Sequence, residues 1–126
     1  MPTPEDVILE MFIRAHVHSA EELEVLLLLF RSAGRWWSAD AVGEALHLDR
    51  GNARGALEAL CGAFLDVRLE TEVLFRFATL NAERERLTAR LAEAYRQDRT
   101  ALLQIVAGHG AARDFADAFR LRKEEP

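Results

Sequence analysis

Three polar residues stand close together in the middle of the chain, and their side chains are of the types that contact nucleic acid. Arg50, Asn52 and Arg54 lie within five positions of one another. Arginine can donate two hydrogen bonds to guanine, asparagine can pair in a similar way with adenine, and both side chains also bind phosphate. The chemistry that this set could perform is therefore the reading of bases or the binding of the phosphate backbone.

Two short helices joined by a tight connection must position these residues. The sequence predicts a helix that Ser38 caps and that runs through Leu46, and a second helix that Asp49 caps and that runs to about Phe64. The connection between them is His47-Leu48. Helical spacing predicts an inward face on the second helix made of Ala53, Leu57, Leu60 and Phe64, and an outward face made of Gly51, Gly55, Glu58 and Gly62.

A β-hairpin is predicted directly after the second helix. Val67 and Leu69 alternate with Arg68, and Val73, Phe75 and Phe77 alternate with Leu74 and Arg76, which is the period of half-buried strands. Residues 69–72 would form the turn. Arg68 and Arg76 would then supply auxiliary contacts to a phosphate backbone.

Two features of this region favour a different interpretation, in which the arginines belong to an ordinary solvated face. Glu58 stands on the outward face of the second helix, and Asp66, Glu70 and Glu72 make the hairpin acidic where phosphate would approach.

The glycines on the outward face of the second helix need an explanation of their own, because each one costs about 1 kcal/mol of helix propensity relative to alanine. Close approach of a backbone to phosphate, or the packing of another helix, would each explain such a stripe.

Helices are predicted on both sides of this core. Thr3-Pro4 begins an N-terminal helix, and Ser19 with Glu22 has the spacing of a capping box for the next one, which would end near Gly34. Asn81 begins a long helix to about Ala107, and Gly108-His109-Gly110 separates it from a last helix with Phe115 and Phe119. The stripe on the long helix that we assign to dimerisation consists of Leu87, Leu91, Ala94, Leu102 and Ile105.

The segment from Glu21 to Ala78 resembles the winged helix-turn-helix regulators of bacteria, broadly the MarR-like, ArsR-like and PadR-like groups. Gly43, Leu46, His47, Leu48 and Asp49 occupy, in order, the positions where these proteins have a small residue, a leucine, a turn, an apolar residue and a polar cap. His47 departs from the glycine that often stands in the turn, although histidine tolerates a left-handed conformation. The resemblance implies a homodimer that presents two recognition helices to successive major grooves, about 34 Å apart.

Length and composition restrict the classes of protein to consider. The 126 residues predict a single domain, with an N-terminal helix in 1–18, the winged core in 19–79 and C-terminal helices in 80–126. The net charge of −5 lies within residues 1–30. The single cysteine, Cys61, and the lack of a secretion-signal pattern or a spanning apolar run predict a cytoplasmic protein with no membrane partner. His16, His18, His47 and His109 show no zinc-ligand spacing, and we expect no metal, no cofactor and no catalytic residue.

The sequence therefore predicts a mainly helical fold with a small β-hairpin, in a protein that binds double-stranded DNA as a homodimer and regulates transcription. The competing hypothesis is a winged-helix interaction module that has lost DNA binding and docks a protein through its glycine-lined face. A third hypothesis, a ligand pocket beneath Trp36 and Trp37, has only those two bulky side chains in its favour, and core packing explains them equally.

Overall fold

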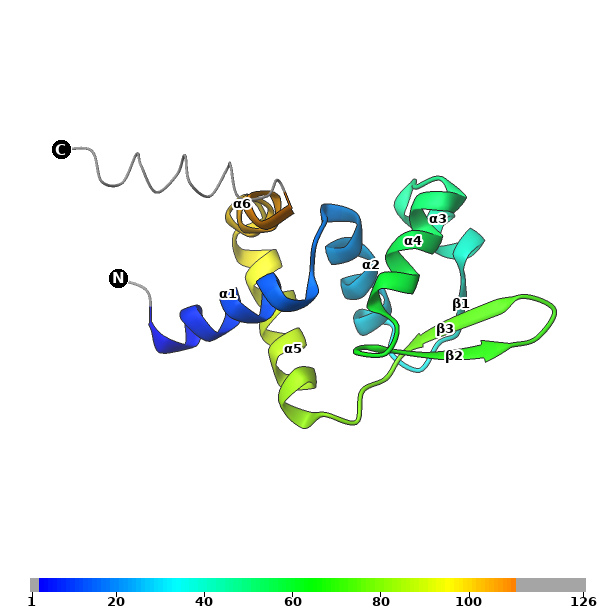
Figure 1. The fold of residues 1–126 in the computed structure, drawn as a ribbon, viewed down its shortest axis with the longest axis horizontal. Coiled ribbons are helices and arrows are strands. Elements are labelled where there is room, and N and C mark those ends of the chain that lie inside the picture. The colour runs from blue at the N-terminus through cyan, green and yellow to red at the C-terminus, as the bar shows by residue number, and fades with distance from the viewer. Residues whose placement is uncertain (1–2, 111–126) are drawn as a thin grey trace.

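The computed structural model describes residues 3–110, which form a mainly helical chain with a small antiparallel sheet (Figure 1). The mainly helical class predicted from the sequence is confirmed. In chain order the elements are α1 (Pro4–His16), α2 (Ala20–Arg31), β1 (Trp37–Ser38), α3 (Ala39–Leu46), α4 (Arg50–Leu60), β2 (Leu65–Leu69), β3 (Val73–Phe77), α5 (Ala82–Gln97) and α6 (Arg99–Gly110).

Helices begin where the sequence places polar capping residues. The side chains of Thr3, Ser19, Ser38, Asp49 and Asn81 each accept a hydrogen bond from a backbone N–H in the first turn of the helix that follows. These caps satisfy donors that have no partner within the helix. The Ser19 box differs in one respect from the predicted pattern, because the Glu22 carboxylate accepts from the N–H of His18, at 2.9 Å, and not from Ser19.

A close backbone contact between Gly43 and Leu48 holds the connection between α3 and α4. His47 adopts the left-handed conformation, with φ 59° and ψ 44°, and the N–H of Leu48 donates to the carbonyl oxygen of Gly43 at 2.9 Å. A Cβ atom at Gly43 would lie 2.6 Å from the carbonyl oxygen of Leu48. Position 43 therefore requires glycine, and histidine takes the left-handed turn at position 47.

The sheet has the strand order β1-β3-β2, and both pairs of neighbours are antiparallel. Trp37 lies opposite Phe75, and Leu65 lies opposite Phe77. These four side chains are buried where the sheet meets the helices.

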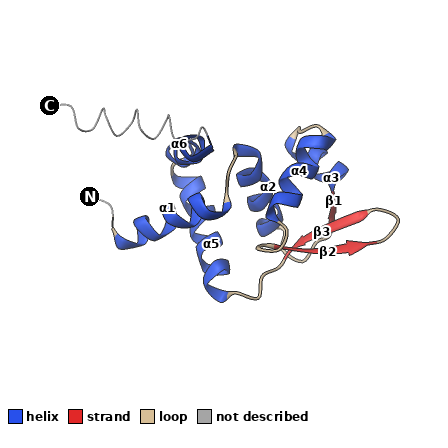
Figure 2. Cartoon of the chain, in the orientation of Figure 1, coloured by secondary structure: helices blue, strands red, loops and turns tan. Residues whose placement is uncertain are grey.

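The outer half of the hairpin projects away from the helices (Figure 2). The prediction of half-buried strands is wrong there, because Val67 is 53% and Leu69 is 78% exposed. The alternation correctly identifies which side chains share a face of the sheet. It does not say how far the helices extend along that face.

The centre of the core is α2, as its nearly continuous apolar sequence predicts. Leu23, Val25, Leu26, Leu27 and Leu29 are at most 1% exposed. Neighbours surround α2 on several sides, since α3, α4, α5, α6 and β3 all pack against it. Burial of each such side chain stabilises the fold by about 1.5–3 kcal/mol.

The predicted long helix after the hairpin is in fact two helices. Asp98 ends α5, and its carboxylate accepts a hydrogen bond from the N–H of Ala101 at 3.1 Å, in the manner of a residue that starts a helix. An aspartate side chain competes in this way for backbone donors, so it breaks a helical pattern that apolar spacing alone would continue. Asp98 is exposed at this corner.

The stripe predicted for dimerisation belongs largely to the core of the single chain. Leu87, Leu91 and Leu102 are buried, and Ala94 and Ile105 are partly buried against the same core. The reason is that α5 and α6 pack against each other, and α1 lies against both (Figure 1). A dimer would have to use other residues. The predicted last helix, with Phe115 and Phe119, lies outside the described residues.

We predict opposite effects for the same substitution at two glycines of the helix pair. Gly43→Ala should lower the free energy of unfolding by about 1–3 kcal/mol, because the new methyl group would overlap the Leu48 carbonyl oxygen. Gly55→Ala on α4 meets no atom within 4 Å and should raise it by about 0.5–1 kcal/mol through helix propensity. Urea unfolding of both variants measures the difference. Equal effects would contradict the close approach at Gly43.

We also predict that His16 makes stability depend on pH. Its ring lies between Phe12 and Phe64, with centroid distances of 5.2 and 5.3 Å. Burial first, and then the charges of Arg84 and His18, lower the pKa of His16 below its usual value. The unfolded chain therefore binds this proton more readily, and the stability that is fully present above the unfolded pKa is lost as the pH falls through the folded pKa.

The measurement is thermal unfolding between about pH 7 and about pH 5, the range in which histidine titrates. His16→Phe keeps an aromatic ring in the contact and removes the titrating group. The Tm of the unmodified protein should fall more steeply with acid than the Tm of this variant. Parallel Tm profiles would exclude His16 as the source of the pH dependence.

Candidate functional site

A groove between α4 and the hairpin includes two of the predicted site residues, Arg50 and Arg54. Its volume is about 420 Å³. Arg50 and Arg54 line one side, and the apolar face of the hairpin lines the other. The lining residues are Ala39, Asp40, Arg50, Arg54, Glu58, Cys61, Val67, Thr71, Glu72, Val73 and Phe75.

Both arginines of the groove are paired with carboxylates. Arg50 Nε lies 3.3 Å from Asp40 Oδ1, and Arg54 Nε lies 3.0 Å from Glu58 Oε2. All four side chains are well exposed, so each pair contributes at most about 1 kcal/mol and can exchange partners. The groove thus holds two guanidinium groups whose charge is locally balanced.

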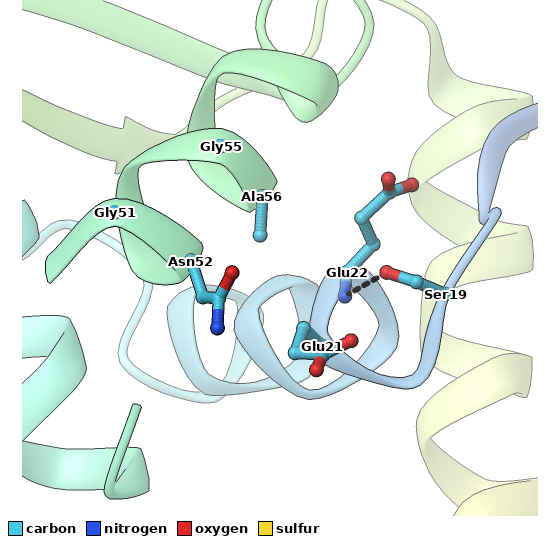
Figure 3. A pocket seen from close by; sticks show the side chains of 7 residues that line it. All are labelled: Ser19, Glu21, Glu22, Gly51, Asn52, Gly55 and Ala56. Atoms are coloured by element: carbon cyan, nitrogen blue, oxygen red, sulfur yellow. Dashed lines mark hydrogen bonds between the residues drawn. The ribbon is translucent and has the colours of Figure 1, made fainter. Parts of the chain in front are cut away.

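Asn52 does not join the two arginines. It lies two positions from each of them, which places it on nearly the opposite side of the helix. There it lines a second, smaller depression of about 220 Å³ beside the start of α2, together with Gly51, Gly55 and Glu21 (Figure 3). Its amide nitrogen donates to the Asp49 carboxylate at 3.0 Å.

Arg68 and Arg76 form a separate cluster around Trp36. The two guanidinium groups lie 4.5 and 4.4 Å from the centre of a Trp36 ring. Because neighbours along a strand point to opposite faces, Arg68 and Arg76 lie on the face away from Val67 and Phe75, which line the groove.

These two arginines are also paired with carboxylates. Arg76 contacts Asp66 at 3.0 Å, and Arg68 contacts Glu70 at 2.8 Å. The five residues predicted to bind DNA are therefore distributed over three separate surfaces. Sequence reasoning missed Trp36 as part of a surface cluster, although its position just before β1 places it beside Arg76 once the strand register is known.

The whole surface of the helix pair and hairpin carries more negative than positive charge. Its four arginines, at 50, 54, 68 and 76, stand among seven carboxylates. These carboxylates are Asp40, Glu44, Asp49, Glu58, Asp66, Glu70 and Glu72. Association with duplex DNA depends on neutralising phosphates, so a net negative field over the contact surface opposes it.

Cys61 lies at the end of the groove next to α4. Burial raises the pKa of its thiol, and the nearby charge of Glu58 adds to the effect. The thiolate is the reactive form of cysteine, so this environment makes the side chain a poor nucleophile. Cys61 acts here as a partly buried apolar residue.

Trp37 is a core residue. It is buried, and its indole nitrogen donates to Ser32 Oγ at 3.1 Å. The Arg35 guanidinium covers its ring at 3.8 Å. The packing interpretation therefore accounts for Trp37, while Trp36 belongs to the arginine cluster on the sheet.

Within residues 3–110, no cluster of three or more histidine, cysteine, aspartate or glutamate side chains is arranged to hold a metal ion. No described helix is both long and apolar enough to span a membrane. Comparisons of the chain with family models, with curated proteins and with solved structures found no significant match.

We predict that the two carboxylates control how the groove arginines respond to phosphate. The double variant Asp40→Asn with Glu58→Gln removes the charged partners of Arg50 and Arg54, which lie at 3.3 and 3.0 Å. Affinity for a duplex at low salt should rise. The slope of log K against log salt should become steeper by up to about 2, since each freed arginine can neutralise one phosphate.

Fluorescence anisotropy of a labelled duplex measures this slope. The double variant Glu10→Gln with Glu93→Gln is the matched control, because it also removes two carboxylates and releases two arginines, Arg14 and Arg96, from pairs of 2.8 and 3.0 Å outside both depressions and the hairpin. If the control and the double variant change equally, the effect comes from total charge and not from the groove.

Proposed function

We propose that residues 20–77 form a winged helix-turn-helix module, with α3 and α4 as the helix pair and the β2–β3 hairpin as the wing. The support is the left-handed turn at His47, the close approach at Gly43, and a hairpin that projects beside α4. The segment from Gly43 to Asp49, which resembles the bacterial regulators, contains these same turn residues.

The function that the geometry supports best is protein contact through the groove between α4 and the wing. The observation that carries this proposal is the charge of the surface, where seven carboxylates outnumber four arginines and each arginine is paired. Such a surface repels a phosphate backbone and does not repel a protein of mixed charge.

The groove also offers apolar area that a protein segment can cover. Val67 is 53% and Val73 is 37% exposed, and both line the groove beside Phe75. Charged side chains of both signs surround this apolar strip, including Arg54 and Glu72. A short amphipathic helix, with apolar anchors on one face and charges of both signs at its edges, has the complementary chemistry.

Binding of double-stranded DNA by a cytoplasmic, dimeric regulator is the second candidate function. The observation in its favour is that Arg50 and Arg54 lie in the first two turns of α4 with well-exposed side chains. Phosphate oxygens could replace Asp40 and Glu58 as their partners, because exposed ion pairs are weak. For this function, the attraction of phosphate to the arginines has to exceed its repulsion by the surrounding carboxylates.

Binding to mixed genomic duplex fragments, measured against salt concentration, separates the two candidates. If the module contacts protein, we expect little DNA to be retained at low salt, both by the unmodified protein and by the double variant Arg50→Ala with Arg54→Ala. A DNA-binding regulator would select fragments, lose affinity steeply with salt, and weaken in the double alanine variant. Selective, salt-dependent retention that requires both arginines would therefore refute the protein-contact proposal.

Site-specific crosslinking in the source cells tests the groove directly. A photoreactive side chain replaces Val73 in the groove or, as a control, the fully exposed Leu80, which does not line it. We expect a discrete protein adduct from position 73 that is absent from position 80 and is lost when Val67 becomes glutamate. Identical adducts from both positions, or DNA adducts alone, would count against the groove.

A further inference from the structure

Strand β2 lies at the edge of the sheet. In the order β1-β3-β2 it pairs with β3 on one side only. On its other side, within the described residues, the sole bridge joins Leu65 to Cys61. Asp66, Val67, Arg68 and Leu69 are all exposed. Backbone donors and acceptors along these positions are available to a further strand.

The side chains of β2 are complementary to those of the same strand running in the opposite direction. The order is Leu65, Asp66, Val67, Arg68, Leu69, so apolar residues alternate with one acid and one base placed symmetrically about Val67. In an antiparallel pair centred on Val67, Asp66 lies opposite the partner's Arg68, and the two copies of Val67 lie opposite each other. Leu65 takes no part in this ladder, because its outer side already forms the bridge to Cys61. Opposite charges and apolar pairs at directly facing positions stabilise such a ladder.

We propose that two copies of this chain associate through antiparallel pairing of their β2 strands about Val67, which joins the two small sheets into one. The arrangement has two-fold symmetry, so every contact occurs twice. The two copies place their apolar β2 side chains on the same face of the joined sheet.

Other registers are much less favourable. A shift by one residue places charged side chains opposite apolar ones along the whole strand. Centring the pair on Asp66 brings two aspartates face to face, and centring it on Arg68 brings two arginines together. The register about Val67 is therefore selected by charge as well as by apolar contact.

The proposed pairing covers part of the exposed apolar face of the wing. Val67 is 53% exposed in the single chain, and in the pair it lies on the two-fold axis against its own copy. The existing contacts of Asp66 with Arg76 and of Arg68 with Glu70 can persist, because each carboxylate accepts several hydrogen bonds.

The interface between two five-residue strands is small, so association should depend on concentration. We expect the mass in solution to rise from one chain of 14.2 kDa toward two chains between about 1 µM and about 1 mM, the range of weak protein contacts. Light scattering and sedimentation equilibrium measure it. A mass of one chain at the highest concentration would overturn the proposal.

Two charge variants test the register. Asp66→Arg puts a new arginine side chain opposite the partner's Arg68, and Arg68→Asp puts a new aspartate side chain opposite the partner's Asp66. Each variant alone should therefore remain monomeric. When the two are mixed, every facing pair again has opposite charges, and a complex with one copy of each should form. Dimers of either variant alone, or no complex in the mixture, would contradict the register about Val67.

A third variant is independent of the ion pairs within the chain. Val67→Lys places two lysines opposite each other on the two-fold axis, and Val67 is exposed enough for the fold to accept the change. Circular dichroism should show an unchanged fold while the dimer is lost. Leu80→Lys, on a fully exposed residue outside the strand, should leave the association as it is. A dimer that survives Val67→Lys would place the interface elsewhere.

Discussion

The arrangement of the helix pair depends on one close contact, between the Gly43 position on α3 and the Leu48 carbonyl at the turn. A Cβ atom there would be 2.6 Å from that oxygen, so the two helices can approach this closely only with glycine. His47 completes the turn in a left-handed conformation, and Asp49 then caps α4. The direction of α4 follows from this turn. That direction decides which of its side chains reach the groove.

The core formed around α2 decides which face of each neighbouring element remains outside. Helix α4 packs against both α2 and α3, and its Ala53, Leu57 and Leu60 are fully buried. The helices end before the tip of the hairpin, so the same apolar face of the sheet is buried at Phe75 and exposed at Leu69. The groove and the free edge of β2 both lie beside the outer part of the hairpin, where apolar side chains are exposed. Both exist because the hairpin extends beyond the helices that cover its base.

The sequence predicts those features of the fold that depend on local interactions. Capping at Ser38 and Asp49, the buried face of α4, and the alternation along the hairpin are short-range patterns, and the structure agrees with them. The break at Asp98 was missed because an aspartate side chain can either accept from the backbone or point to solvent. The burial of Leu87 and Leu91 within one chain was also missed, because a stripe of leucines looks the same whether it meets its own chain or a second copy.

The candidate site was predicted less well, because it depends on register and on partners distant in sequence. Arg50 and Arg54 share a face, but the amide of Asn52 lies behind the helix, and Arg68 and Arg76 stack on Trp36 across the sheet. Their carboxylate partners, such as Asp40 and Asp66, are ten positions away along the chain. The number of arginines in a sequence does not predict the electrostatic field of a surface, because that field depends on the charges that lie near each arginine. In this chain, the pairing of each arginine with a carboxylate is the reason that we propose protein contact ahead of DNA binding for this surface.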